Sequence, residues 1–101
     1  MLNLCSLMSE IARPTVSPYA ATKGALRQFT RALATEWAID NIQVNGIAPG
    51  FIATDMNIPL MEDKTVNDRV INGTPAGRWG TTDEVASVAA FSVSPGANFV
   101  C

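Results

Sequence analysis

Two short apolar segments on either side of a long helical stretch most restrict the fold of this 101-residue chain. Residues 2–6 and 42–48 read as strands, and residues 18–39 between them carry apolar side chains at helical spacing. A strand, a helix and a second strand in this order form a βαβ unit, in which the strands are parallel and the crossover is right-handed. The sequence therefore predicts an α/β fold with a parallel sheet, in which ligands bind beyond the carboxyl ends of the strands.

The start of the predicted helix carries side chains that could take part in a reaction. Ser17 suits the N-cap and Pro18 suits the first helical position, so we expect the helix to begin here. Tyr19 and Lys23 are four residues apart and project from one face, about a turn from each other. A cation beside a phenol favours the phenolate, which can exchange a proton with an alcohol or a carbonyl. Ser6 ends the first apolar segment, where a hydroxyl can hold a substrate oxygen; taken alone, it reads as a capping serine.

Together with a Pro-Gly-x-x-x-Thr turn downstream, these residues resemble the short-chain dehydrogenase/reductase family. Ser6, Tyr19 and Lys23 fall on the catalytic Ser, Tyr and Lys of that family, at the usual separation. The resemblance implies that Tyr19 exchanges the hydroxyl proton, that Lys23 assists it and bonds the nicotinamide ribose, and that Ser6 holds the substrate oxygen. Tyr-x-x-x-Lys alone usually marks a solvated helix face, so the assignment depends on the combination.

The turn after the second strand is expected to meet the cofactor. Asn45, Pro49, Gly50 and Thr54 fall on the family's Val-Asn strand and Pro-Gly-x-x-x-Thr turn. The resemblance implies that the backbone at Pro49 and Gly50 approaches the nicotinamide amide, that Ile52 and Thr54 bond it, and that the cofactor is NAD or NADP. An isolated Pro-Gly would read as an ordinary turn.

The resemblance covers nearly the whole chain and implies the C-terminal part of a Rossmann-like doubly wound parallel sheet. Residues 1–101 are then a partial catalytic domain, with a substrate lid over residues 51–73 and a further helix that opens on a capping box at 81–84. The lid residues read equally well as ordinary packing. The family's Gly-rich phosphate loop has no counterpart in these residues, so we expect the chain alone to be inactive.

Three segments, beginning at Cys5, Ala34 and Thr74, are similar to the gluconate 5-dehydrogenase branch of the family. This similarity implies an NAD(P)-dependent oxidoreductase that transfers hydride between a nicotinamide and a secondary alcohol or ketone, with a sugar acid such as gluconate as a candidate. The family also implies a homo-oligomer for the complete protein. A second hypothesis is a catalytically silent module that folds or docks on a partner subunit, because two parallel strands leave unpaired edges.

Composition excludes other classes of function. The chain has no histidine, which rules out a Ser-His-Asp triad and an HExxH zinc site, and Cys5 and Cys101 lack metal-site spacing. The formal net charge is −2, from 7 basic and 9 acidic residues without a basic block, so neither nucleic acid nor an anionic membrane is an expected partner. No apolar run approaches the ~20 residues of a membrane helix. We therefore expect a cytoplasmic protein without a metal.

Overall fold

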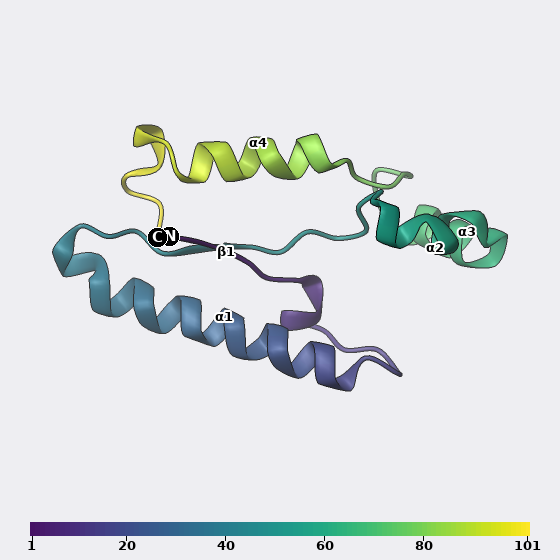
Figure 1. Cartoon of the computed structure of the whole chain (residues 1–101), viewed down its shortest axis with the longest axis horizontal. Coiled ribbons are helices and arrows are strands. Elements are labelled where there is room, and N and C mark those ends of the chain that lie inside the picture. Colours follow the sequence, from purple (N-terminus) through teal and green to yellow (C-terminus); the bar gives the residue numbers. More distant parts are fainter. The chain divides into compact units, whose positions relative to one another are not determined.

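The computed structural model describes residues 1–101, which form two units: residues 1–49 with 88–101, and residues 50–87. Figure 1 shows the course of the chain through its short strands, α-helices and 3₁₀ helices. In chain order these are β1 (Leu2–Leu4), η1 (Leu7–Ser9), α1 (Ser17–Trp37), η2 (Ala38–Asp40), β2 (Asn45–Ile47), η3 (Asp55–Asn57), α2 (Ile58–Glu62), α3 (Lys64–Gly73), α4 (Thr82–Ser92) and η4 (Pro95–Ala97).

The first unit contains the predicted βαβ arrangement. β1 pairs with β2 in parallel, with Leu2 opposite Asn45 and Leu4 opposite Ile47, and α1 packs beside the strands (Figure 1). Both strands are shorter than predicted. β1 ends early because the Ser6 side chain accepts a hydrogen bond from the Met8 amide, which turns the chain into η1. Val44, just before β2, is the most buried side chain, at 1% exposure.

The start of α1 differs from the prediction. Ser17 is the first helical residue and not the cap; the N-cap is Val16, which makes no side-chain capping bond. Thr15 has a φ of 74°, in the left-handed region, and the turn there brings the Val16 carbonyl into position to accept from the Ala20 amide at 2.8 Å. The helix therefore begins one residue earlier than expected, and it ends at Trp37, where η2 follows.

The buried face of α1 also differs from the apolar stripe read from the sequence, which comprised Ala25, Phe29, Ala32, Leu33 and Trp37. Leu33 is buried as expected, but Phe29 is 54% exposed and Thr30 is buried instead. Thr30 can be buried because its hydroxyl donates to the Leu26 carbonyl at 2.8 Å and is thus satisfied. The buried face of α1 is therefore rotated relative to the prediction, and Thr30 is buried where Phe29 was expected to be.

The second unit is organised around a short contact between its two ends. Ile52 and Gly80 form a parallel bridge, in which the Gly80 amide donates to the Phe51 carbonyl at 2.9 Å and the Ala53 amide donates to the Gly80 carbonyl at 2.9 Å. A Cβ at Gly80 would lie 2.7 Å from Ile52 Cδ1, so a larger residue there would have to displace the end of the Ile52 side chain. Trp79 is buried, and its ring meets Phe51 edge-on at 5.6 Å.

The segment predicted as a lid, residues 51–73, contains η3, α2 and α3. Asp63 caps α3 by accepting from the Val66 amide at 3.1 Å, so α3 begins at Lys64. Pro59 lies in the first turn of α2, where its missing N–H is tolerated. The function of residues 51–73 as a lid stays a prediction.

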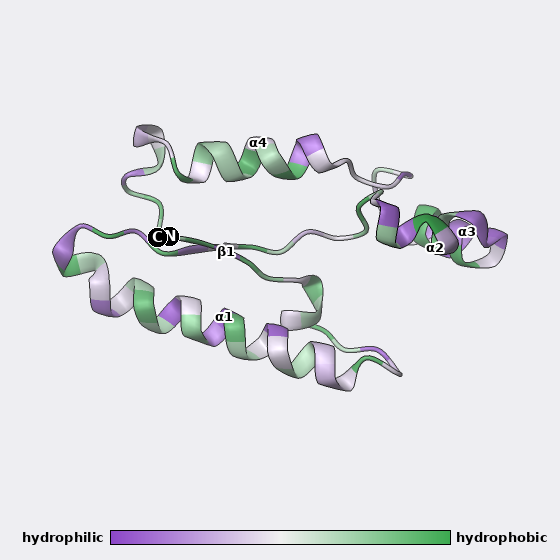
Figure 2. Cartoon of the chain, in the orientation of Figure 1, coloured by the Kyte–Doolittle hydropathy of each residue, from purple (hydrophilic) through white to green (hydrophobic).

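Hydrophobic side chains are mostly exposed. Only six hydrophobic residues are buried, whereas seventeen large ones, including Ile39, Met56 and Phe99, are exposed. In Figure 2, α4 is hydrophilic at its first turn, where Asp83 and Glu84 lie, and more apolar beyond it. None of the helices has the length and apolar character needed to cross a membrane.

Candidate active site

Tyr19 and Lys23 are neighbours at the start of α1, as their spacing predicts. The Lys23 Nζ lies 5.8 Å from the centre of the Tyr19 ring, within the range of a cation–π contact. Tyr19 is 47% exposed, so a large part of this residue is accessible. The first turns of α1 therefore present a phenol and an ammonium on one accessible face.

Lys23 also connects the helix to the end of β1. Its Nζ donates a hydrogen bond of 2.7 Å to the carbonyl of Leu4, the last residue of that strand. An ammonium has three donors, so two stay available for other acceptors. The contact holds the charge of Lys23 beside the point at which the chain leaves the sheet.

Ser6 follows this point by two residues and caps η1. Its Oγ accepts from the Met8 amide at 3.2 Å, and its amide donates to the Ser9 Oγ at 3.3 Å, which completes a capping box. The interpretation of Ser6 as a capping serine is therefore correct. A hydroxyl that accepts one bond still has its own proton to donate, so a catalytic use of Ser6 stays a prediction.

The boundary between the two units falls inside the predicted nicotinamide turn. Pro49 belongs to the first unit and Gly50 to the second unit. Within the second unit, the Ile52 carbonyl accepts from the Asn57 Nδ2 at 2.7 Å. Thr54 is the N-cap residue of η3, but its side chain makes no capping bond. The hydroxyl of Thr54 is thus not engaged at the start of η3, and the cofactor contacts of these residues stay predictions.

A hollow of about 240 Å³ lies in the first unit, lined by Cys5, Glu10, Arg27, Thr30 and Arg31 among others. Ser6, Tyr19 and Lys23 do not line it. Arg27 forms an ion pair with Glu10 at its edge. The hollow is therefore separate from the residues predicted to be catalytic.

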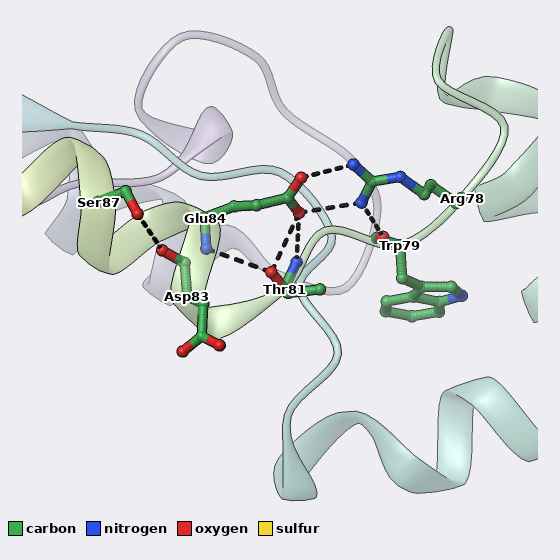
Figure 3. Close-up of polar contacts among 6 residues, drawn as sticks. All are labelled: Arg78, Trp79, Thr81, Asp83, Glu84 and Ser87. Carbon is green, nitrogen blue, oxygen red and sulfur yellow. Dashed lines mark hydrogen bonds and ion pairs between the residues drawn. The ribbon is translucent and has the colours of Figure 1, made fainter.

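Arg78, Trp79, Thr81 and Glu84 form a polar cluster at the start of α4, shown in Figure 3. The Thr81 amide donates to Glu84 Oε2 at 2.8 Å, and the Glu84 amide donates to Thr81 Oγ1 at 3.2 Å, so the predicted capping box is confirmed. Arg78 adds a bidentate pair to the same carboxylate, with Nη1 at 2.9 Å from Oε2 and Nη2 at 2.5 Å from Oε1.

This cluster has a clear electrostatic signature. The hydrogen bonds from Arg78 and then from the Thr81 amide lower the pKa of Glu84 to about 2, from an ordinary value of 4.5. The same pair raises the pKa of Arg78. The cluster lies within the second unit and extends to α3, because Trp79 Nε1 donates to Asn67 Oδ1 at 2.7 Å. Both oxygens of the Glu84 carboxylate are thus bonded within the chain, which is typical of a structural site.

Two hydrogen bonds between β1 and α1 were missed from the sequence. One is the Lys23 bond to Leu4, and the other is a bond of 2.9 Å from Asn3 Nδ2 to Thr30 Oγ1. The signals for the second were an Asn inside an apolar strand and a Thr four residues from Leu26 on the inner face of the helix. A backbone acceptor such as the Leu4 carbonyl leaves no signal in a sequence.

Comparison with known proteins identifies the relatives of the chain. The family model described as enoyl-(acyl carrier protein) reductase matches residues 1–101. The chain is 44% identical over 100 residues to gluconate 5-dehydrogenase of Gluconobacter oxydans, and 45% identical over 100 residues to 5-keto-D-gluconate 5-reductase of Escherichia coli K12. Each alignment covers 99% of this chain and 39% of the relative, so the chain spans about two fifths of their length.

A solved structure agrees with these relatives. The gluconate 5-dehydrogenase from Burkholderia cenocepacia, in complex with NADP and tartrate, superposes with a TM-score of 0.92 at 47% identity, over 98% of this chain and 39% of that one. The parallel strands and α1 are thus part of a Rossmann-type α/β fold. The chain belongs to the short-chain dehydrogenase/reductase family.

Proposed function

We propose that this chain is the catalytic segment of an NAD(P)-dependent oxidoreductase that interconverts a secondary alcohol and a ketone. The observation that supports this proposal is the pair at the start of α1, where the Lys23 Nζ lies 5.8 Å from the centre of the exposed Tyr19 ring. A phenol beside a cation is suited to general acid–base catalysis on an alcohol oxygen.

The three proposed catalytic residues have different tasks. Tyr19 gives its proton to the substrate oxygen in reduction and takes it back in oxidation. Ser6 donates a hydrogen bond to the same oxygen, and Lys23 stabilises the negative charge that develops there and on Tyr19. A bound nicotinamide supplies or accepts the hydride. Donors directed at developing charge stabilise the transition state more than the ground state, and so raise the rate.

Each unit has donors that suit part of a nicotinamide nucleotide. After its bond to the Leu4 carbonyl, Lys23 keeps two N–H groups, which suit the two hydroxyls of a ribose. The Thr54 hydroxyl makes no capping bond at η3 and suits the nicotinamide amide, together with the backbone of Pro49, Gly50 and Ile52. The cofactor is NAD or NADP, and the Burkholderia relative, which holds NADP, supports the second.

The substrate class is a sugar acid such as gluconate. Support comes from relatives named gluconate 5-dehydrogenase and 5-keto-D-gluconate 5-reductase, which are 44% and 45% identical to the chain. We also infer a cytoplasmic homo-oligomer for the complete protein, as the family resemblance implies. The 54% exposure of Phe29 on the outer face of α1 supports an interface there, and sedimentation of a complete enzyme would test it.

The test uses a hybrid enzyme, in which this chain replaces the matching 100 residues of the Gluconobacter oxydans gluconate 5-dehydrogenase. We expect the hybrid to oxidise gluconate with NAD or NADP. We expect Tyr19→Phe to lower kcat by about 10²- to 10⁴-fold, the usual contribution of an acid–base residue, while circular dichroism stays unchanged. Turnover is measured from nicotinamide absorbance.

Ser17→Ala is the matched control, because Ser17 lies on the same turn of α1 and makes no capping bond. It should leave kcat unchanged. Tyr19→Phe rates equal to those of the parent hybrid would overturn the assignment of Tyr19. A folded hybrid that has no dehydrogenase activity would count against the proposed reaction as a whole.

A second candidate function is a silent module that folds or docks on a partner subunit. It is favoured by the two-stranded sheet, whose outer edges are unpaired, and by the seventeen exposed large hydrophobic residues. This second hypothesis predicts that the 101-residue chain neither binds NADP nor folds fully at low concentration. NADP titration and circular dichroism of the chain over a dilution series distinguish the two.

A further inference from the structure

A part-buried hydrogen bond joins β1 to α1, two helical turns along α1 from Lys23. Asn3 Nδ2 donates to Thr30 Oγ1 at 2.9 Å, and the same hydroxyl donates to the Leu26 carbonyl at 2.8 Å. Thr30 is only 7% exposed and is the one polar residue in the buried class. Both ends of the bond are therefore held: one by the strand, and the other by the backbone of the helix.

This bond is adjacent in structure to the one that Lys23 makes. Asn3 and Leu4 are consecutive residues of β1, and the first binds Thr30 while the carbonyl of the second accepts from Lys23 Nζ. Thr30 follows Lys23 by seven residues, which is two helical turns, so both lie on nearly the same face of α1. The strand thus contacts one face of the helix at two points.

Apolar packing and hydrogen bonds differ in how well they fix the position of α1 along the strands. α1 packs against β2 and buries Leu33, but apolar burial has no directional preference, so it tolerates sliding. A hydrogen bond weakens steeply outside a narrow range of distance and angle. A slip of one residue along a helix is a shift of about 1.5 Å, which the Asn3–Thr30 bond would not survive.

We propose that Asn3 and Thr30 are positioning residues, which set the position of α1 along β1 and thereby hold Lys23 and Tyr19 in place for the reaction. The catalytic part of this inference rests on the proposed function. Misplacing a catalytic group by about 1 Å can cost about a hundredfold in rate, so the bond has a measurable consequence.

The first experiment measures kcat and KM of the hybrid enzyme with three substitutions. Thr30→Val removes the hydroxyl but keeps the shape, and we expect kcat to fall tenfold to a hundredfold with less than a twofold change in KM. Thr30→Ser keeps the hydroxyl and should retain kcat within about threefold. Thr35→Val is the matched control, because Thr35 Oγ1 also donates to its own helix, at 3.0 Å to the Arg31 carbonyl, but is exposed.

A second measurement does not depend on activity. In the hybrid enzyme labelled with ¹³C at the leucine carbonyls, the Leu4 carbonyl shift reports its bond to Lys23. Lys23→Met defines the shift with the bond lost. We expect Thr30→Val and Asn3→Leu to move the Leu4 signal towards that value, and Thr30→Ser and Thr35→Val to leave it in place.

The outcomes separate this inference from the proposed function. If the parent hybrid is inactive but the Leu4 carbonyl shifts as expected, the reaction assignment fails and the positioning role holds. If Tyr19→Phe is inactive while Thr30→Val has full kcat and an unchanged Leu4 shift, the positioning role is wrong. A loss in Thr30→Ser as large as that in Thr30→Val would also overturn it, because serine keeps the hydroxyl and the loss would then not follow the hydrogen bond.

Discussion

The start of α1 and the start of α4 solve the same problem in different ways. Every helix begins with four backbone N–H groups that have no partner in the helix. At α4, Thr81 and Glu84 bond each other's amides and Arg78 holds the Glu84 carboxylate, so the polar groups are paired within the chain (Figure 3). At α1, no side chain caps the helix, and Tyr19 lies exposed two residues after its first residue.

This difference indicates that the start of α4 has a structural role, whereas the start of α1 has polar groups available to a ligand. A fully paired cluster gains stability from each bond and has little left to offer a substrate. An uncapped start beside a phenol and an ammonium keeps donors and acceptors that a substrate and a ribose can use. Substitutions at the two starts should therefore affect different quantities: rate at α1 and stability at α4.

The largest effect is expected for Lys23→Met in the hybrid enzyme. It removes the ammonium beside Tyr19, and loss of one donor at a site of developing charge typically lowers the rate about a hundredfold to a thousandfold. We expect that loss in kcat/KM, measured with gluconate and NADP, with little change in thermal stability. A fully active Lys23→Met enzyme would contradict the proposed difference between the starts of α1 and α4, because the start of α1 would then not contribute to the reaction.

The matched control for this change is Lys64→Met, which removes the other lysine of the chain. Lys64 pairs with Asp68 on α3 at 2.6 Å, and its side chain is 87% exposed. We expect the kcat/KM of Lys64→Met to stay within about twofold of the parent, because exposed pairs contribute little. If kcat/KM fell by similar factors in both variants, the effect would come from the change in net charge and not from the position of Lys23 beside Tyr19.

The start of α4 could be predicted from the sequence, because its determinants are local. Thr81 and Glu84 are three residues apart, and a capping box depends only on that spacing and the two residue types. The neighbourhood of Tyr19 and Lys23 was predictable for the same reason, since one helical turn brings them together. Strand order followed from the βαβ rule, which concerns consecutive elements.

What the sequence did not reveal depends on tertiary contacts. Thr15 takes a left-handed φ of 74°, which is unusual for threonine and moves the helix start to Ser17. Thr30 is buried, and Phe29 exposed, because Asn3 and the Leu26 carbonyl both bond the Thr30 hydroxyl. A hydrogen-bond partner from a distant part of the sequence cannot be predicted from residue types alone. The ion pair of Arg78 was missed because it spans a loop, where no periodicity fixes geometry.

A smaller effect is expected for the two serine and threonine positions that begin the helices. Thr81→Ala removes a capping hydroxyl, which costs about 1 kcal/mol, and Ser17→Ala removes a hydroxyl that caps nothing. We expect amide exchange at Glu84 to rise about fivefold in Thr81→Ala, as that free energy implies, measured by NMR. Amides in the first turn of α1 should exchange unchanged in Ser17→Ala.

Equal protection changes in these two variants would remove the distinction between the helix starts. If Ser17→Ala exposed the first turn of α1 as Thr81→Ala exposes that of α4, the Ser17 hydroxyl would be a cap in solution. The start of α1 would then be a conventional closed helix end, and its openness to a ligand would have to come from Tyr19 and Lys23 alone.

The smallest effect is expected in the pH dependence of the second unit. The pKa of Glu84 is lowered to about 2 because Arg78 and the Thr81 amide donate to the carboxylate, so the folded state favours its ionised form. This contribution is complete above the ordinary value of 4.5 and is lost as the pH falls towards about 2. Its size is limited, because the Arg78 and Glu84 side chains are 55% and 50% exposed.

Glu84→Gln should therefore make the stability of the second unit depend less on pH between 4.5 and about 2. Trp79 lies in this unit and Trp37 in the first, so urea unfolding followed by Trp79 fluorescence in a Trp37→Phe background reports the second unit. Glu62→Gln is the control, because Glu62 lies in the same unit and forms no ion pair. If Glu84→Gln and Glu62→Gln had the same pH profile, the carboxylate would not be held in solution as the cluster in Figure 3 shows, and the start of α4 would be nearly as open as that of α1.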